Sequence, residues 1–330
     1  MWGKSCGASC APAPVPERVG RRRGEASAGL PANVVVFERG WLSSNNVLFV
    51  GAEEAALVDT GYATHADQTL ALVASVLGER PLDRVLNTHL HSDHCGGNAA
   101  LQRRYPSLRT DIPPGEAPLV ERWDAQGLSF LATGQTCPRF AFTGLLEPGT
   151  ECLLGDVAWQ VHGAPGHDPH SVILFDPVSR TLISADALWE NGFGIAFPEL
   201  MGEPSFGDIA ATLDLIEKLS PRQVIPGHGG VFADVDRSLR TARKRLAGME
   251  RDPVKHARHA MKVLMKFKLL EWQVVPRAEW EAWVGGTPYF ERIRARFFAD
   301  ASLAELMREL LGELIAVGAA QSDALGVRNA

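Results

Sequence analysis

The sequence predicts an α+β fold in which helices cover a mixed β-sheet, and three observations support this prediction. Short apolar segments of strand length recur through the first 235 residues. Longer segments, whose apolar residues have helical spacing, separate them. Several of the short segments end at a His or an Asp near glycine, as in sheets that present reactive side chains at one rim. With 330 residues, 45% of them hydrophobic, the chain can bury a large core and carry an additional part.

The N-terminal part of this pattern contains strands and one helix. The first strands are expected at residues 33–37, 46–50 and 55–59, with turns between them. Residues 65–78 are expected to be helical, because Leu70, Val73 and Leu77 recur at intervals of three or four residues. The apolar pair Val85-Leu86 indicates a further strand.

A second group of strands follows residue 150. These strands are expected at residues 157–161, 172–175, 181–185 and 223–225. Residues 208–219 are expected to form an amphipathic helix that stops before Pro221. Residues 111–149 lie between the two groups and hold scattered aromatic residues and a helix-like stretch at 118–130. This region either is a surface excursion pinned to the core or lies beside the functional cleft.

The C-terminal hundred residues are expected to be helical and to carry a charge asymmetry. Pro253 separates two helices, and residues 302–317 form a last helix with Ser302 as its cap. Residues 237–268 contain eleven Lys or Arg and two acidic residues, a net charge of +9, so the rest of the chain carries −15. Such a segment is either solvated surface or a wall that attracts anionic substrates.

The most informative stretch is residues 87–97, Asn-Thr-His-Leu-His-Ser-Asp-His-Cys-Gly-Gly. Alternate side chains of an extended segment point the same way, so His89 and His91 can bind one metal ion. Asp93 and His94, past the strand end, can turn toward a second ion. Neutral imidazole and carboxylate are ligands that suit zinc, iron or manganese. The stretch therefore predicts a site for two metal ions.

Three later segments supply the ligands that such a site still lacks. His167 ends Gly-Ala-Pro-Gly-His after one predicted strand, and Asp186 follows the apolar run 181–185. His228 lies between two glycines after another strand. Each of these residues lies where a strand gives way to a loop, so a rigid sheet can bring them to one rim.

With these residues, the chain resembles the metallo-β-lactamase fold superfamily over roughly residues 33 to 232. The resemblance implies a four-layer αββα sandwich with a C-terminal helical extension. It implies that one metal ion is bound by His89, His91 and His167. It implies that the other is bound by Asp93, His94 and His228. Asp186 would bridge the two ions, and Asp59 in Leu-Val-Asp-Thr-Gly would lie behind the ligands and orient the loop.

The function implied by this resemblance is that of a dinuclear metal-dependent hydrolase. A metal-bridging hydroxide would cleave a thioester, an ester or a lactone. Asp93 would position the hydroxide and take up its proton, and Asp186 would hold the ions at the right separation. We expect two divalent ions, zinc first, with iron or manganese as alternatives. True β-lactamases of this fold have a cysteine where this chain has Asp186, which disfavours antibiotic hydrolysis.

Three functional classes remain open from the sequence. The first is a hydrolase like the hydroxyacylglutathione hydrolases (glyoxalase II) and acyl-CoA thioesterases of this superfamily, acting on an anionic acyl carrier or an ester. The second is an endoribonuclease or phosphodiesterase of the same fold, which the basic segment would suit. The third is an iron-dependent redox or binding role, which is less favoured because no flavin-binding segment is recognised. The sequence does not specify the acyl group, the carrier or the oligomeric state.

Candidate substrate contacts lie near the predicted ligands. Trp189 and Phe193, in the loop that leaves Asp186, could form a pocket wall. His170, three residues after His167, could donate to a substrate or cap its own loop.

The chain is expected to have three parts, with boundaries read from composition and the resemblance. Residues 1–32, with Pro12, Pro14, Pro16 and the run Arg21-Arg22-Arg23, read as a disordered leader. Residues 33–235 form the catalytic domain and residues 236–330 a C-terminal helical domain. The five cysteines suggest no disulfide framework, and no apolar run approaches the ~20 residues that cross a bilayer. We therefore expect a cytoplasmic protein that does not bind membranes.

Overall fold

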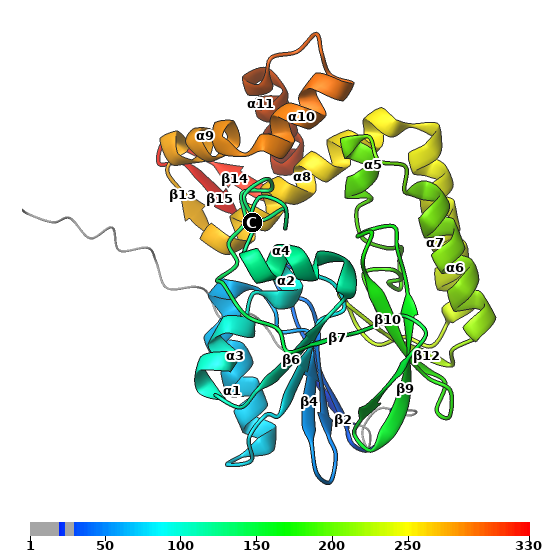
Figure 1. Cartoon of the computed structure of the whole chain (residues 1–330). Helices are drawn as coiled ribbons and strands as arrows, with labels where there is room; N and C mark the ends of the chain where they lie inside the picture. The colour runs from blue at the N-terminus through cyan, green and yellow to red at the C-terminus, as the bar shows by residue number, and fades with distance from the viewer. Residues whose placement is uncertain (1–19, 24–29) are drawn as a thin grey trace, which may run out of the picture.

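Two β-sheets lie side by side in the lower half of the molecule as Figure 1 shows it. The structure is a computed structural model and describes residues 20–23 and 30–330. The first sheet has seven strands in chain order: β1 (Gly20–Arg23), β2 (Val34–Glu38), β3 (Asn46–Val50), β4 (Ala55–Val58), β5 (Arg84–Leu86), β6 (Arg109–Ile112) and β7 (Gly144–Leu145). The second has the order β12-β11-β10-β9-β8: β12 (Gln223–Pro226), β11 (Thr181–Ala185), β10 (Val172–Asp176), β9 (Val157–Gly163) and β8 (Glu151–Leu154).

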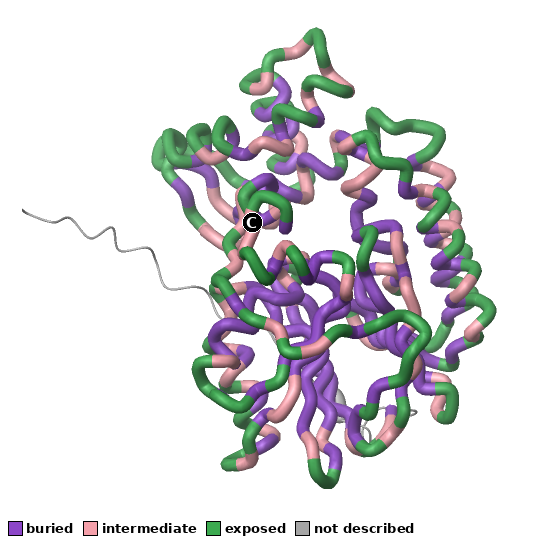
Figure 2. The backbone as a smooth tube through the Cα atoms, in the orientation of Figure 1, coloured by how far each residue is buried: buried purple, intermediate pink, exposed green. Residues whose placement is uncertain are grey.

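Both sheets are mixed, and their side chains alternate between two apolar layers. In β2, Val34 and Val36 face a core shared with Trp159 of β9 in the second sheet. Val35 and Phe37 of the same strand belong to the core on the opposite face. This period of two is what a strand buried on both faces requires, and each fully buried side chain of this size contributes roughly 1.5–3 kcal/mol. Figure 2 shows the strands as a continuous buried centre.

Helices cover the outer face of each sheet. On the first sheet, Val73 of α1 (Ala66–Leu77) and Leu101 of α3 (Asn98–Arg104) complete the outer core. On the second sheet, Leu213 of α6 (Phe206–Leu219) and Leu246 of α7 (Val235–Arg251) do the same. The predicted αββα sandwich is therefore confirmed.

Two sequence predictions need correction. The helix expected at 118–130 ends early: α4 covers Ala117–Arg122, after the short turn η2 (Pro114–Glu116), and Trp123 ends it in the left-handed region with φ 53°. Within the predicted leader, Gly20–Arg23 pairs antiparallel with β2, so disorder is wrong for these four residues, whose backbone extends the sheet. Residues 1–19 and 24–29 of that leader lie outside the described residues.

The C-terminal helices surround a core of their own. Its elements are α8 (Pro253–Trp272), β13 (Val274–Val275), α9 (Arg277–Gly286), α10 (Pro288–Phe297), α11 (Leu303–Ala316), β14 (Ala320–Ser322) and β15 (Val327–Asn329). Pro253 begins α8, and Ser302 and Glu305 form a capping box at α11, as the sequence predicts. Ile195 and Leu200, the latter in α5 (Phe197–Met201), also pack into this core and connect it to the sandwich. Among the described residues, none of the helices has the length and apolar character needed to cross a bilayer.

Candidate metal centre

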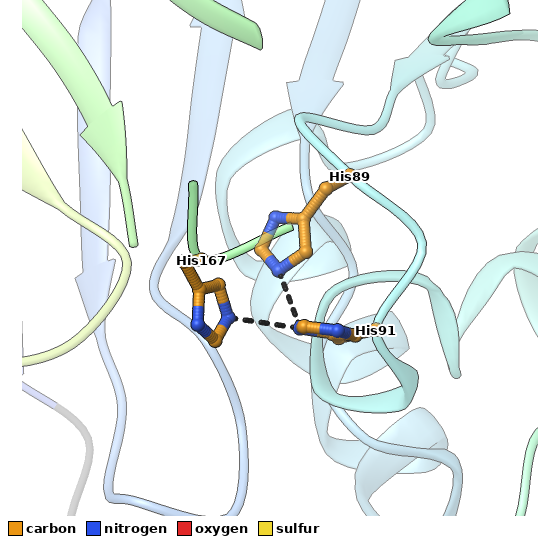
Figure 3. Close-up of side chains that lie close together, drawn as sticks. All are labelled: His89, His91 and His167. Carbon is orange, nitrogen blue, oxygen red and sulfur yellow. Dashed lines mark hydrogen bonds between the residues drawn. The ribbon is translucent and has the colours of Figure 1, made fainter. Parts of the chain in front are cut away.

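Three imidazoles meet at one end of the sandwich (Figure 3). His89 follows β5, His91 precedes the short helix α2 (Ser92–Cys95), and His167 follows β9. His91 Nδ1 lies 3.1 Å from His89 Nε2 and 2.9 Å from His167 Nε2. Zinc held at about 2.0–2.1 Å by tetrahedral ligands needs nitrogens about 3.3 Å apart. The three side chains therefore fit the ligand set of one cation.

Asp93, His94 and His228 form a second group beside the first. Asp93 and His94 lie on α2, and His228 follows β12. His228 Nε2 lies 3.1 Å from Asp93 Oδ2, and His94 Nε2 lies 3.9 Å from the same oxygen. These three residues could hold a second cation.

Asp186 lies between the two groups. Its Oδ2 is 3.4 Å from His167 Nε2 and 3.9 Å from His228 Nε2. Its Oδ1 is 3.5 Å from His94 Nε2. Gly227 permits this position, because a Cβ there would lie 2.2 Å from Asp186 Oδ1. A carboxylate that faces both groups meets the requirement for a bridging ligand.

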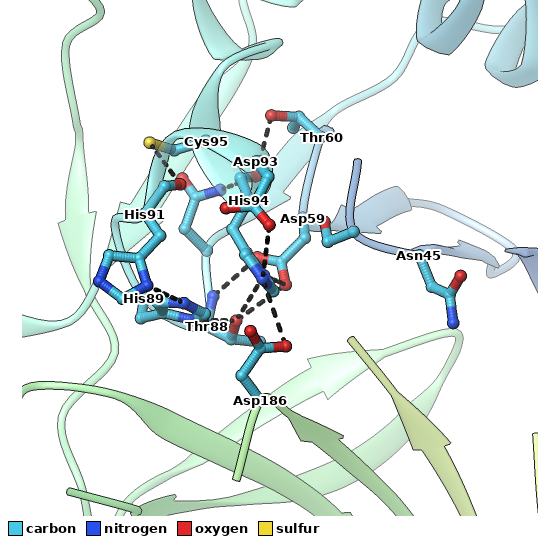
Figure 4. A network of polar contacts seen from close by, with 12 residues as sticks. Asn45, Asp59, Thr60, Thr88, His89, His91, Asp93, His94, Cys95 and Asp186 are labelled. Atoms are coloured by element: carbon cyan, nitrogen blue, oxygen red, sulfur yellow. Dashed lines mark hydrogen bonds and ion pairs between the residues drawn. The ribbon is translucent and has the colours of Figure 1, made fainter. Parts of the chain in front are cut away.

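Asp59 orients His94 from behind (Figure 4). His94 Nδ1 donates to Asp59 Oδ2 at 2.8 Å, and Asp59 also accepts from the Thr88 backbone N–H at 2.9 Å and the Thr88 hydroxyl at 2.8 Å. The proton on Nδ1 leaves a lone pair on His94 Nε2, which is buried without a hydrogen-bond partner. A buried nitrogen without a partner is costly, and a cation between His94, Asp93 and Asp186 would satisfy it. The residues present therefore fit a metal ion.

The first group has similar support. His167 Nδ1 donates to the Ile195 carbonyl at 2.6 Å, which directs Nε2 toward His91. Gly194 allows this contact, since a Cβ there would lie 2.4 Å from His167 Nδ1. His89 Nδ1 lies 3.2 Å from the Thr88 hydroxyl, and its Nε2 faces the shared space. Backbone and hydroxyl groups thus select the imidazole nitrogen that faces the centre.

The electrostatics of the centre favour cation binding. Burial disfavours charge on Asp186, yet His228, His94 and His167 outweigh it and hold the pKa of Asp186 well below its usual value. Burial and the neighbouring His91 lower the pKa of His167 to about 4. At neutral pH this carboxylate is therefore ionised and this imidazole neutral, which are the forms that bind metal ions.

Two residues of the centre were not identified from the sequence. Asp168 Oδ2 lies 3.9 Å from His91 Nε2, the nitrogen that faces away from the other imidazoles. Its position directly after His167 was a usable signal. The Trp41 ring stacks on His228, with centroids 5.4 Å apart and planes at 14°, although 59% of Trp41 is exposed. No spacing or periodicity in the sequence points to Trp41.

A cavity of about 670 Å³ opens over the centre. His91, Asp93, His167, Asp186 and His228 line its floor. Its opposite wall comes from α8 and includes Val263, Leu264, Phe267 and Leu270. The metal centre therefore opens into a space with a largely apolar wall.

The predicted substrate contacts have different positions. Trp189 lines the cavity and donates from Nε1 to Asp186 Oδ1 at 3.1 Å. His170 also lines it, and its backbone N–H donates to the Asp168 carboxylate at 2.8 Å. Phe193 does not line the cavity: its side chain is 1% exposed and packs in the core between the second sheet and α7. The prediction of Phe193 as a pocket wall is therefore wrong, because its side chain turns inward from the loop.

The basic segment 237–268 does not form a continuous cationic wall. Arg258 pairs with Glu309 and Glu313 of α11. Glu313 also pairs with Lys262, and Lys268 pairs with Glu271. Among the described residues, the Lys and Arg side chains of the segment that line the cavity are Arg245 and Lys266.

Comparisons with known proteins agree with this geometry. Residues 39–228 match the family model of the metallo-beta-lactamase superfamily. A hydroxyacylglutathione hydrolase from Anaeromyxobacter dehalogenans is 32% identical over 200 residues, which cover 59% of this chain and 65% of that protein. A type A flavoprotein from Rhodobacter capsulatus is 26% identical over 220 residues, which cover 59% of this chain and 46% of that protein. The chain thus spans less than two thirds of the length of either relative.

Solved structures share the fold. A metallo-beta-lactamase from Cronobacter sakazakii has a TM-score of 0.53 at 18% identity, covering 68% of this chain and 92% of that one. A metal-soaked flavodiiron core from Synechocystis sp. has a TM-score of 0.52 at 16% identity, covering 71% of this chain and 62% of that one. Because the family model matches more than half of the sequence, the chain belongs to the metallo-beta-lactamase superfamily.

Proposed function

We propose that this chain is a dinuclear metal-dependent hydrolase that cleaves an ester or thioester bond, with lactones as related substrates. The main support is the arrangement of the centre. Two groups of three candidate ligands lie on either side of Asp186, at the floor of a cavity of about 670 Å³. Nitrogen and carboxylate ligands suit zinc, with iron or manganese as alternatives. When bound, such a pair of ions supplies Lewis acidity and a nucleophilic water at neutral pH.

The protein's own residues contribute position and proton transfer. The Asp93 side chain is 14% exposed, against 6% for Asp186. Asp93 is thus the more open of the two carboxylates and is placed to accept a proton from an attacking water. Trp41 and Trp189 cover His228 from two sides, each with its ring centroid 5.4 Å away. These rings place two aromatic surfaces beside the ligand His228, at the edge of the cavity.

The apolar wall and the similarity to a hydroxyacylglutathione hydrolase both support acyl ester or thioester substrates. Phe267 and Leu270 of α8 offer an apolar surface to an acyl chain. The nucleic-acid alternative receives less support from the eleven basic residues of the segment. Four of them pair with carboxylates: Arg243, Arg258, Lys262 and Lys268. Within the described part of the chain, only Arg245 and Lys266 of the segment line the cavity, where a phosphate backbone would have to bind.

A substrate panel on metal-quantified protein tests this proposal. The panel contains acyl-CoA, acyl-glutathione, lactones and single-stranded RNA, each assayed with protein before and after chelation. We expect turnover of esters or thioesters that chelation abolishes. Turnover of RNA alone, weakening steeply with salt, would overturn the proposal.

A further inference from the structure

Arg245 of α7 reaches the cavity beside the metal centre. Its guanidinium carbon lies 5.5 Å from the Phe193 ring centroid. Its side chain presses on Gly192, where a Cβ would lie 3.0 Å from Arg245 Cδ. Gly192 pairs with Trp189 through a backbone hydrogen bond of 2.7 Å, and Trp189 in turn binds Asp186. The loop that carries the bridging carboxylate therefore also holds Arg245 in place.

Arg245 has no carboxylate partner among the described residues. Arg243, two residues earlier on the same helix, binds Asp214 and Glu217 at 2.7 Å each. The other cation of the cavity, Lys266, donates to the Ala319 carbonyl, Asn329 Oδ1 and the Ala330 carbonyl. Arg245 has instead a contact of 3.4 Å with His259 Nε2. Three cavity carboxylates outside the ligand set, Glu116, Asp168 and Glu203, form no ion pair with it.

A partly buried guanidinium that lines the cavity without a carboxylate partner in the described chain points to an external anion. Burial lowers the pKa of Arg245, but an arginine stays charged at neutral pH. A partly desolvated charge without a partner is unfavourable, and an anion that binds it recovers that free energy. The planar guanidinium can form two parallel hydrogen bonds to a carboxylate or a phosphate through its N–H edge, and Arg245 is among the residues that line the cavity.

We propose that Arg245 binds an anionic group of the substrate, a carboxylate or a phosphate, and so selects anionic esters or thioesters. This inference rests on the proposed hydrolase function. The inference assigns substrate binding to Arg245 of the basic segment. Arg243, whose guanidinium is paired with two carboxylates, has no such role.

A matched pair of esters tests the inference. Mono-4-nitrophenyl glutarate carries a terminal carboxylate, and 4-nitrophenyl hexanoate has a similar chain without charge. We expect Arg245→Gln to lower the ratio of kcat/KM for the glutarate ester over the hexanoate ester by about 10- to 100-fold, through KM. Arg245→Lys keeps the charge and is expected to retain part of the ratio. Arg243→Gln, on the same helix, is the control and should keep the whole ratio.

A binding measurement separates this inference from the proposed function. Glutarate and inorganic phosphate are titrated by calorimetry into metal-loaded wild type, Arg245→Gln and Arg243→Gln, without any turnover. If Arg245→Gln binds the anions more weakly and Arg243→Gln does not, the anion site is supported even if no ester is hydrolysed. The anion whose affinity falls more in Arg245→Gln identifies the preferred group. Unchanged affinity for both anions in Arg245→Gln, or an unchanged ester ratio, overturns the inference.

Discussion

The metal-centre loops and the C-terminal helices are both dense in charge, but their charges act differently. His89 and His94 are fully buried, and His94 lies between 2.8 and 3.9 Å from three carboxylates, those of Asp59, Asp93 and Asp186. On α8 and α11, Arg258 and Glu309 meet at a partly exposed surface. Buried ionisable groups must be paired or bind an ion, whereas ion pairs at the surface contribute little to the free energy of unfolding. A run of charge in a sequence therefore indicates a site only where the fold buries it.

The largest expected effect comes from the bridging carboxylate. Asp186→Ala should reduce metal content at both positions, because each group loses a shared ligand. Activity should fall on the order of 1,000-fold, as expected when several kcal/mol of Lewis-acid stabilisation is lost. Elemental analysis and steady-state kinetics measure both. Normal occupancy of both positions in this variant would contradict a bridging role.

His256, a buried histidine of α8, tests whether a buried ionisable group in the C-terminal helices affects stability. Burial, His259 and Arg245 lower the pKa of His256 to about 4, against an unfolded value near 6.5. Between these pH values the unfolded chain binds a proton that the folded chain does not. The free energy of unfolding therefore falls as the pH drops from 6.5 toward 4, by up to about 3 kcal/mol from this residue.

His256→Phe should remove this part of the pH dependence, and the Phe206 ring, whose centroid lies 6.0 Å from that of the His256 ring, offers an aromatic neighbour to the new side chain. Urea unfolding of wild type and variant at pH 7 and pH 4.5 gives the difference directly, and contributions from other groups cancel. Equal losses of stability in the two proteins would show that His256 titrates alike in both states.

Asp59→Asn should have a smaller, localised effect. A carboxylate offers two acceptor oxygens and an amide only one, so the variant side chain cannot accept both from the Thr88 backbone N–H, now at Oδ1, and from His94 Nδ1, now at Oδ2. Its NH2 group faces one of these two donors, which disturbs the contact that sets the His94 tautomer. Substitution of such a supporting partner typically costs 10- to 100-fold in metal affinity, here in the second group. Competition with a chromophoric chelator measures it.

The matched control is Asp176→Asn. Asp176 is equally buried and accepts from Val178 and Ser179 in a turn away from the centre, so it should leave metal affinity unchanged. An equal loss in both variants would assign the effect to general destabilisation.

The smallest effect is expected at the surface of the C-terminal helices. Lys262→Gln removes a pair of 2.6 Å with Glu313, whose side chain is 37% exposed. We expect a change below about 1 kcal/mol in the free energy of unfolding. A loss above about 2 kcal/mol would mean that surface charge on these helices stabilises the fold as buried charge does in the centre.

The sequence by itself determined the strands, the helices and the candidate ligands at the strand ends, whereas the sandwich and the division of the seven ligands between two ions followed from the resemblance to the superfamily. Strand and helix periods are local, and each ligand follows a strand end, so linear spacing carries this information. β3 and β11 have the predicted bounds. Residues 123–143 were harder, because their turns depend on contacts with distant elements and have no period.

Only the tertiary structure decided which side chains surround the centre. Trp41 stacks on His228 from a position 187 residues earlier in the chain, and Phe193 turns into the core rather than the cavity. Arg243 and Arg245 look alike in the sequence, yet one meets carboxylates of α6 and the other meets none. Side-chain direction and the partners supplied by distant elements set these outcomes, and neither is encoded in the local pattern of apolar and charged residues.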